Sequence, residues 1–166
     1  MSHALSVPTA DHLPTLLARD SALEQACECI VDAGLAGARW VLFPEGCIPN
    51  YPAWVWGLYS STDPLLDALR AEVVANTVSI PSDATDRLCQ VAQRAQINVV
   101  VGVIECDNRA GGVICYNTLL FINAQGQMMG IYRTRVASDT SQGTWIPSKH
   151  ETPAGEASAL SHIGGI

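Results

Sequence analysis

The 166-residue sequence predicts a single α/β domain. Hydrophobic residues make up 48% of the chain and charged residues 15%, a balance that favours a sheet buried under helices over a disordered chain. Segments with helical spacing of apolar residues alternate with short apolar runs rich in β-branched residues. Their order is helix, strand, two helices and three strands. This order fits one α/β layer whose sheet is extended by hairpins.

The first predicted element is a helix that begins near residue 21. Ser21 and Glu24 have the spacing of a capping box, and apolar residues follow at helical spacing. Glycines then interrupt the pattern, so we expect the helix to end between Gly34 and Gly37.

The next element, a strand over residues 39–43, leads directly into an acid. Four consecutive apolar residues, Trp40 to Phe43, predict a strand that is buried on both faces. Pro44 has no N–H to donate, so pairing should stop just before Glu45. The carboxyl end of a strand is where open α/β sheets place their ligand crevices, which makes Glu45 the candidate catalytic acid. From these residues alone, a solvated loop glutamate remains the alternative.

Four further elements follow the loop after this strand. Pro64 comes after an aspartate and predicts a helix start, and Ser82 can cap another helix. The β-branched run over residues 97–105 predicts a central strand. Residues 113–123 and 127–133 predict two more strands, joined by a short Ala-Gln-Gly turn.

Composition argues against several classes of partner. The formal net charge of -7 repels phosphate backbones and anionic lipid surfaces, so we expect neither nucleic acid nor membrane partners. The chain starts without a basic and apolar leader and contains no run long enough to span a bilayer, which predicts a cytoplasmic protein. Its four histidines have no ligand spacing, so we expect no metal and no cofactor.

The six cysteines lack C-x-x-C spacing, and most lie inside apolar patterns. They predict reduced, buried thiols rather than a disulfide framework or a metal site. These cysteines are Cys27, Cys29, Cys47, Cys89, Cys106 and Cys115.

Four sequence segments resemble the nitrilase branch of the carbon-nitrogen hydrolase superfamily. They are A-R-W-V-L-F-P-E-G-C-I-P-N-Y-P-A-W-V-W, P-S-D-A-T-D-R-L-C-Q-V-A-Q-R-A-Q-I-N-V-V-V-G-V-I-E, C-Y-N-T-L-L-F-I-N-A-Q-G and H-I-G-G-I. The resemblance covers residues 16–133 and 162–166, whereas residues 134–161 keep the family spacing but diverge in identity. It implies an α-β-β-α sandwich, truncated to roughly its first half and forming one partial domain over residues 1–166.

The resemblance also implies a Cys-Glu-Lys triad, of which this chain carries one member. Glu45 matches the glutamate, which takes the thiol proton and later activates water. The lysine, which would stabilise charge in the tetrahedral intermediate, falls on Thr134. The family's second glutamate falls on Ser141. Its nucleophilic cysteine would fall two residues beyond Ile166.

Other site residues follow from the same resemblance. Tyr51 and Trp54 match the loop near the substrate pocket and are expected to be pocket walls, although packing of the loop remains an alternative. Glu105 matches a family glutamate and is expected to support the site by hydrogen bonding, or else to be a surface residue at a strand end. Cys47 is close to Glu45 in sequence, but no nearby cation would lower its pKa, which argues against a substitute nucleophile.

The resemblance therefore implies a hydrolase that converts a nitrile to a carboxylic acid and ammonia, and that is inactive in this chain alone. Two alternatives remain: a non-catalytic partner that binds a full-length nitrilase homologue, and an amidase-like hydrolase, against which the I-P-N-Y-P loop argues. Half a sandwich leaves an apolar sheet face uncovered. We therefore expect the chain to form homo-oligomers, to aggregate, or to bind such a homologue.

Overall fold

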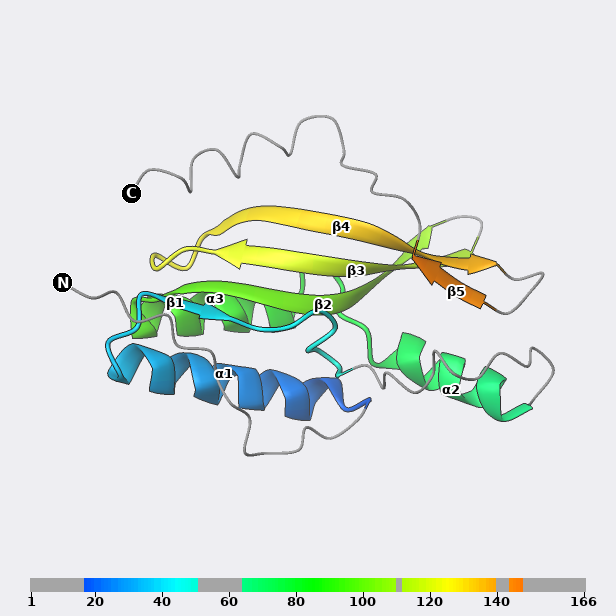
Figure 1. Cartoon of the computed structure of the whole chain (residues 1–166), viewed down its shortest axis with the longest axis horizontal. Coiled ribbons are helices and arrows are strands. Elements are labelled where there is room, and N and C mark those ends of the chain that lie inside the picture. Colours follow the sequence, from blue (N-terminus) through cyan, green and yellow to red (C-terminus); the bar gives the residue numbers. More distant parts are fainter. Residues whose placement is uncertain (1–16, 51–63, 110–111, 140–143, 148–166) are drawn as a thin grey trace.

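The structure is a computed structural model that describes residues 17–50, 64–109, 112–139 and 144–147. Figure 1 shows its helices and strands arranged in two layers. The elements in chain order are α1 (Arg19–Leu35), β1 (Trp40–Leu42), α2 (Pro64–Ala75), α3 (Asp83–Ala95), β2 (Asn98–Arg109), β3 (Gly112–Ile122), β4 (Met128–Asp139) and β5 (Thr144–Pro147). The predicted α/β order is confirmed.

The strands form one sheet in the order β1-β2-β3-β4-β5. β1 runs parallel to β2, and each later strand is antiparallel to the one before it. In Figure 1, α1 and α3 lie along one face of this sheet, with β1 and β2 drawn in front of α3. We call this the helix face and the other the open face.

Alternate strand residues build the core on the helix face. They are fully buried against the helices, and each apolar side chain of this size stabilises the fold by about 1.5–3 kcal/mol when removed from water. The set from β1, β2 and β3 comprises Val41, Val99, Val101, Val103, Leu120 and Ile122.

The predicted strand over residues 39–43 exists, but it is not buried on both faces. Val41 and Phe43 point into the core, whereas the side chain of Leu42 between them is 39% exposed. This expectation is wrong because helices cover only one face of the sheet in the described residues.

Two of the expected helix starts are confirmed, and one is wrong. α2 begins at Pro64, and Ser82 precedes α3, where Thr85 Oγ1 accepts a hydrogen bond from the Ser82 N–H at 2.9 Å. α1, however, begins at Arg19 rather than at the capping box expected at Ser21. Its end at Leu35 agrees with the expected glycine stop.

The last strands extend further than the sequence indicates. β4 continues past Arg133 to Asp139, and β5 pairs with it over Val136 to Asp139. Part of the divergent stretch over residues 134–161 is therefore strand. It can be strand without a clear hydrophobic period because its backbone pairs with β3 and β5.

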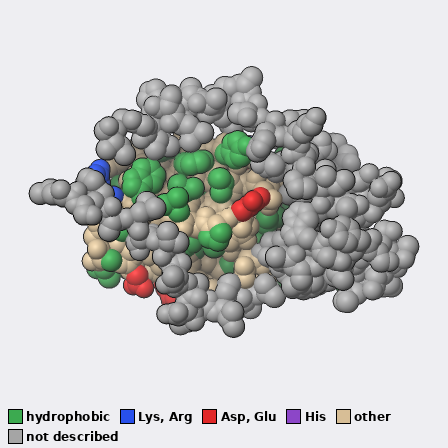
Figure 2. Space-filling model, in the orientation of Figure 1, with side chains coloured by type: hydrophobic (Ala, Val, Ile, Leu, Met, Phe, Trp, Pro, Cys, Tyr) green, Lys and Arg blue, Asp and Glu red, His purple; other side chains and the backbone are tan. Residues whose placement is uncertain are grey.

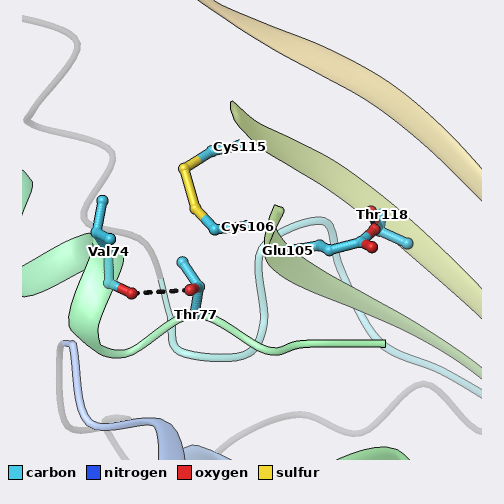
Figure 3. Close-up of a disulfide and its surroundings, with 6 residues drawn as sticks. All are labelled: Val74, Thr77, Glu105, Cys106, Cys115 and Thr118. Carbon is cyan, nitrogen blue, oxygen red and sulfur yellow. Dashed lines mark hydrogen bonds between the residues drawn. A yellow bond between two sulfur atoms is a disulfide. The ribbon is translucent and has the colours of Figure 1, made fainter. Parts of the chain in front are cut away.

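Cys106 and Cys115 form a disulfide between β2 and β3, which corrects the expectation that all six thiols are reduced. The two residues lie directly opposite each other in the antiparallel register, with their Cα atoms 4.2 Å apart. Figure 3 shows this bond on one side of the strands, with Glu105 and Thr118 directed away from it. The register that creates this pair is not visible in cysteine spacing.

This pairing predicts a specific thiol count. Four cysteines are free in the structure and six are present in the sequence. We expect Ellman's reagent to detect four thiols in the unfolded, unreduced protein and six after reduction. A count of six without a reductant would contradict the disulfide.

Among the described residues, no helix has the length and apolar character needed to cross a membrane. The same part of the chain contains no group of three or more His, Cys, Asp or Glu placed to hold a metal ion.

Candidate active site

Glu45 lies in a short loop whose two ends are hydrogen-bonded to β2. Before the loop, the N–H of Phe43 donates to the Val100 carbonyl at 2.8 Å. After it, Ile48 rejoins the edge of β2, where its carbonyl accepts from the Ile104 N–H at 2.8 Å. Pro44 has no N–H to extend the ladder, so the chain leaves the sheet where the sequence predicts. The acid is therefore held by fixed backbone on both sides.

Gly102 determines how closely the loop that carries Glu45 approaches the sheet. A Cβ at Gly102 would lie 2.3 Å from the carbonyl oxygen of Pro44 and 2.7 Å from the Cα of Glu45. Real Cβ atoms do not come this close to backbone atoms. A glycine in the centre of β2 is thus required for the loop to lie directly on the open face.

The carboxylate of Glu45 is bound by a residue from another strand. Asn117 Nδ2, on β3, donates a hydrogen bond to Glu45 Oε1. Asn117 is the cross-strand partner of Thr134 on β4, the position onto which the resemblance places a lysine. Directly opposite residues in an antiparallel pair have Cβ atoms about 4.5–5.5 Å apart. The backbone register therefore brings Glu45, Asn117 and position 134 to one place on the sheet.

The sequence reasoning did not single out Asn117. A signal was present, because a polar carboxamide interrupts the apolar run over residues 113–123, and asparagine is disfavoured in strands. Only the fold shows that its partner is an acid 72 residues away in the sequence.

Glu105 lies on the opposite face of the sheet from this site. It is one residue along β2 from Ile104, the cross-strand partner of Asn117, and successive strand residues point to opposite faces. Its carboxylate accepts two hydrogen bonds from the Arg133 guanidinium, at 2.7 and 2.9 Å, and one from Thr118 Oγ1 at 2.8 Å. The structure thus joins Glu105 to the β2-β3-β4 packing and not to Glu45.

This ion pair also defines the role of Arg133, the cation that precedes position 134. Arg133 precedes Thr134 on β4, and its guanidinium is engaged by the buried Glu105 carboxylate on the helix face. It is therefore not a substitute for the lysine on the open face.

Cys47 is two residues from Glu45, but its chemistry does not suit a nucleophile. The thiol is half-buried, and burial raises its pKa to about 11, with a smaller contribution from Cys29. Burial also raises the pKa of the other free thiols, Cys27, Cys29 and Cys89. Each of these thiols is held in the protonated, unreactive form at neutral pH.

We expect Cys47 to react slowly with iodoacetamide at neutral pH. Only the thiolate reacts, and with a pKa of about 11 the thiolate is roughly a thousandth of the population at pH 8. The rate should rise about tenfold per pH unit and level off only above pH 11. Peptide mapping after timed alkylation measures this rate, with the urea-unfolded chain as the control. A fast-reacting Cys47 at pH 7 in the folded protein would contradict its assignment as a packed thiol.

Several expected site residues lie outside the described residues. They are Tyr51, Trp54 and Ser141, the position onto which the resemblance places a second glutamate. At position 134 the structure describes the backbone pairing.

The surroundings of the acid on the open face are apolar. Leu119 and Phe121 on β3 are half-buried there, and Leu42 on β1 is exposed. Figure 2 shows hydrophobic side chains gathered over the centre of the molecule, with an acidic side chain among them. Glu45 therefore lies on a face of the sheet that also carries apolar side chains.

Comparison with known proteins identifies the family. Residues 8–160 match the carbon-nitrogen hydrolase family. The chain is 32% identical over 162 residues to Nitrilase 2 from an unknown prokaryotic organism, covering 94% of this chain and 50% of that protein. It is 26% identical to the arylacetonitrilase of Aspergillus niger, covering 96% and 47%.

The fold agrees with this assignment. The crystal structure of an N-terminal amidase superimposes with a TM-score of 0.52 at 15% identity, covering 82% of this chain and 29% of that chain. The chain spans about half the length of the curated relatives it matches. It is a member of the carbon-nitrogen hydrolase family, in the nitrilase branch.

Proposed function

We propose that the protein is a nitrilase-type hydrolase in which Glu45 is the proton acceptor. The reaction converts a nitrile and two waters to a carboxylic acid and ammonia. The observation that carries this proposal is the fixed position of Glu45 over Gly102, with its carboxylate bound by Asn117 beside position 134. The names of the relatives, Nitrilase 2 and arylacetonitrilase, support a nitrile as the substrate.

Each step of this chemistry needs a particular group. A thiolate attacks the nitrile carbon, and the carboxylate accepts the thiol proton and returns it to the substrate nitrogen. The covalent thioimidate adds water, which the carboxylate activates, and then releases ammonia. A second water cleaves the thioester to give the acid. A lysine ammonium stabilises the charge that develops in the tetrahedral intermediate.

We further propose that residues 1–166 alone do not turn over nitriles. Position 134 carries a threonine hydroxyl, which supplies no positive charge. The free thiols among the described residues have raised pKa values, as shown above. Glu45 is therefore the one triad function that we assign to this chain.

A complementation assay tests both statements. The partner is the part of Nitrilase 2 that this chain does not match, expressed as a separate polypeptide. We expect no ammonia from residues 1–166 with any nitrile, and ammonia from the Thr134→Lys variant mixed with that partner. In the active mixture Glu45→Gln should lower the rate by roughly 10²–10⁴-fold, the usual contribution of a general base. Turnover that persists with Glu45→Gln would exclude the proposed role of Glu45.

A second candidate function is a non-catalytic partner of a full-length nitrilase or of a second copy of this chain. The apolar open face favours it, because exposed contiguous apolar surface often marks an interaction site. Ammonia release by a full-length nitrilase, measured with and without this chain, separates this candidate from the first. The same assay with amides in place of nitriles tests the amidase-like alternative.

A further inference from the structure

Asn117 has features that sheet packing alone does not explain. It lies in the middle of β3 on the open face, where its neighbours along the strand are Cys115 and Leu119. Asparagine is among the residues that strands disfavour, and an apolar side chain would pack better at such a position. Among the described residues, the Asn117 side chain makes one hydrogen bond, which it donates to Glu45.

The hydrogen bond constrains the carboxylate in a useful way. Glu45 is exposed, and a glutamate with three side-chain torsions would sample many orientations. Donation from the Asn117 amide to Oε1 restricts that freedom and leaves Oε2 without a partner among the described residues. The amide carries no charge, so it orients the carboxylate without neutralising it.

We propose that Asn117 is the positioning residue of the catalytic base. Its amide binds Glu45 Oε1 so that Oε2 is the oxygen presented to the reacting thiol and water. The catalytic role of Glu45 in this inference rests on the proposed function. The contact between Asn117 and Glu45, and its effect on the Glu45 side chain, can be measured without turnover. Because reaction rates depend steeply on the placement of the base, the position of this amide matters for the rate.

The test uses NMR of the complete 166-residue chain. We expect the side-chain NH₂ resonances of Asn117 to shift in a single step as the pH is lowered through the range where Glu45 is protonated. The step should be absent in Glu45→Gln, an exposed substitution that leaves the fold unchanged. The NH₂ of Asn98, which donates to the backbone carbonyl of Arg39, serves as the control and should not follow this step. A step that persists in Glu45→Gln, or its absence from the unmodified chain, would overturn the proposal.

A second measurement separates positioning from simple packing. Asn117→Leu has nearly the same shape but no donor. We expect the two Glu45 γ protons, which have distinct resonances when the side chain is fixed, to become equivalent in this variant while its melting temperature stays unchanged. If the γ protons remain distinct, another group fixes Glu45 and the proposal fails. If the variant does not fold, the pH titration of the unmodified chain and of Glu45→Gln still decides. Failure of the complementation assay would leave both NMR results intact, so the two proposals fail separately.

Discussion

Replacing Arg133 by methionine should lower the free energy of unfolding by about 3 kcal/mol, the low end of the usual cost of removing one partner of a buried ion pair, because the Arg133 side chain itself is 31% exposed. Glu105 is 5% exposed and depends on the guanidinium of Arg133 for two of its hydrogen bonds. Without this cation the carboxylate stays buried with Thr118 Oγ1 as its remaining described donor. Urea unfolding at neutral pH, followed by circular dichroism, measures the loss.

A matched control and a double variant identify the cause. Arg87 pairs with Glu24 on the surface between α3 and α1, so Arg87→Met should have little effect, as exposed ion pairs contribute little. Glu105→Leu combined with Arg133→Met removes both charges and should recover most of the lost stability. Equal losses for Arg87→Met and Arg133→Met would show that the buried pair has no special role.

Gly102→Ala is expected to displace the loop that carries Glu45 and to destabilise the protein by about 1–3 kcal/mol, the usual cost of overpacking a closed site. The added methyl would meet the carbonyl oxygen of Pro44 and the Cα of Glu45, which are backbone atoms and cannot rotate aside. For a chain of this size each kcal/mol lowers the melting temperature by about 2–4 °C. Differential scanning calorimetry gives the stability change, and the Asn117 NH₂ resonances report whether Glu45 has moved.

Gly37→Ala provides the comparison. A Cβ there has no atoms within 4 Å, and the cost comes from its positive φ of 79° alone. It should therefore reduce stability modestly without changing the Asn117 resonances. If Gly102→Ala also left those resonances unchanged, the close approach of the loop to β2 would not control the position of Glu45.

Local signals in the sequence predict much of this fold. Pro64 marks the start of α2, and the β-branched run over residues 97–105 forms most of β2. Pro44 has no backbone N–H to donate to a neighbouring strand, which predicts where β1 stops and therefore where Glu45 leaves the sheet. These features depend on a residue's own backbone chemistry, which is why sequence alone reveals them.

The errors arise where a distant residue decides the outcome. α1 begins at Arg19. The N–H of Arg19 donates a 3.3 Å hydrogen bond to Oδ1 of Asn76, the residue that follows α2, so a tertiary contact replaces the local cap expected at Ser21. The burial of Leu42 depends on which layers cover the sheet.

Strand register accounts for what was missed at the site. The Cys106–Cys115 disulfide, the contact of Asn117 with the acid and the orientation of Glu105 all follow from which residues of β2, β3 and β4 lie opposite one another. A shift of one residue would reverse every side chain. Composition and spacing contain no information about that shift.

The two kinds of strand pairing also bear on how the protein folds. β2, β3 and β4 are joined by short hairpin connections, whereas β1 must reach β2 across the whole α2 and α3 region. Pairing between distant segments carries a larger loop-closure entropy, so it follows local pairing. We expect the hairpin sheet to form first and β1 to dock onto it afterwards. The Glu45 carboxylate would then reach its position at the end of folding, on strands that already hold its hydrogen-bond donor, Asn117.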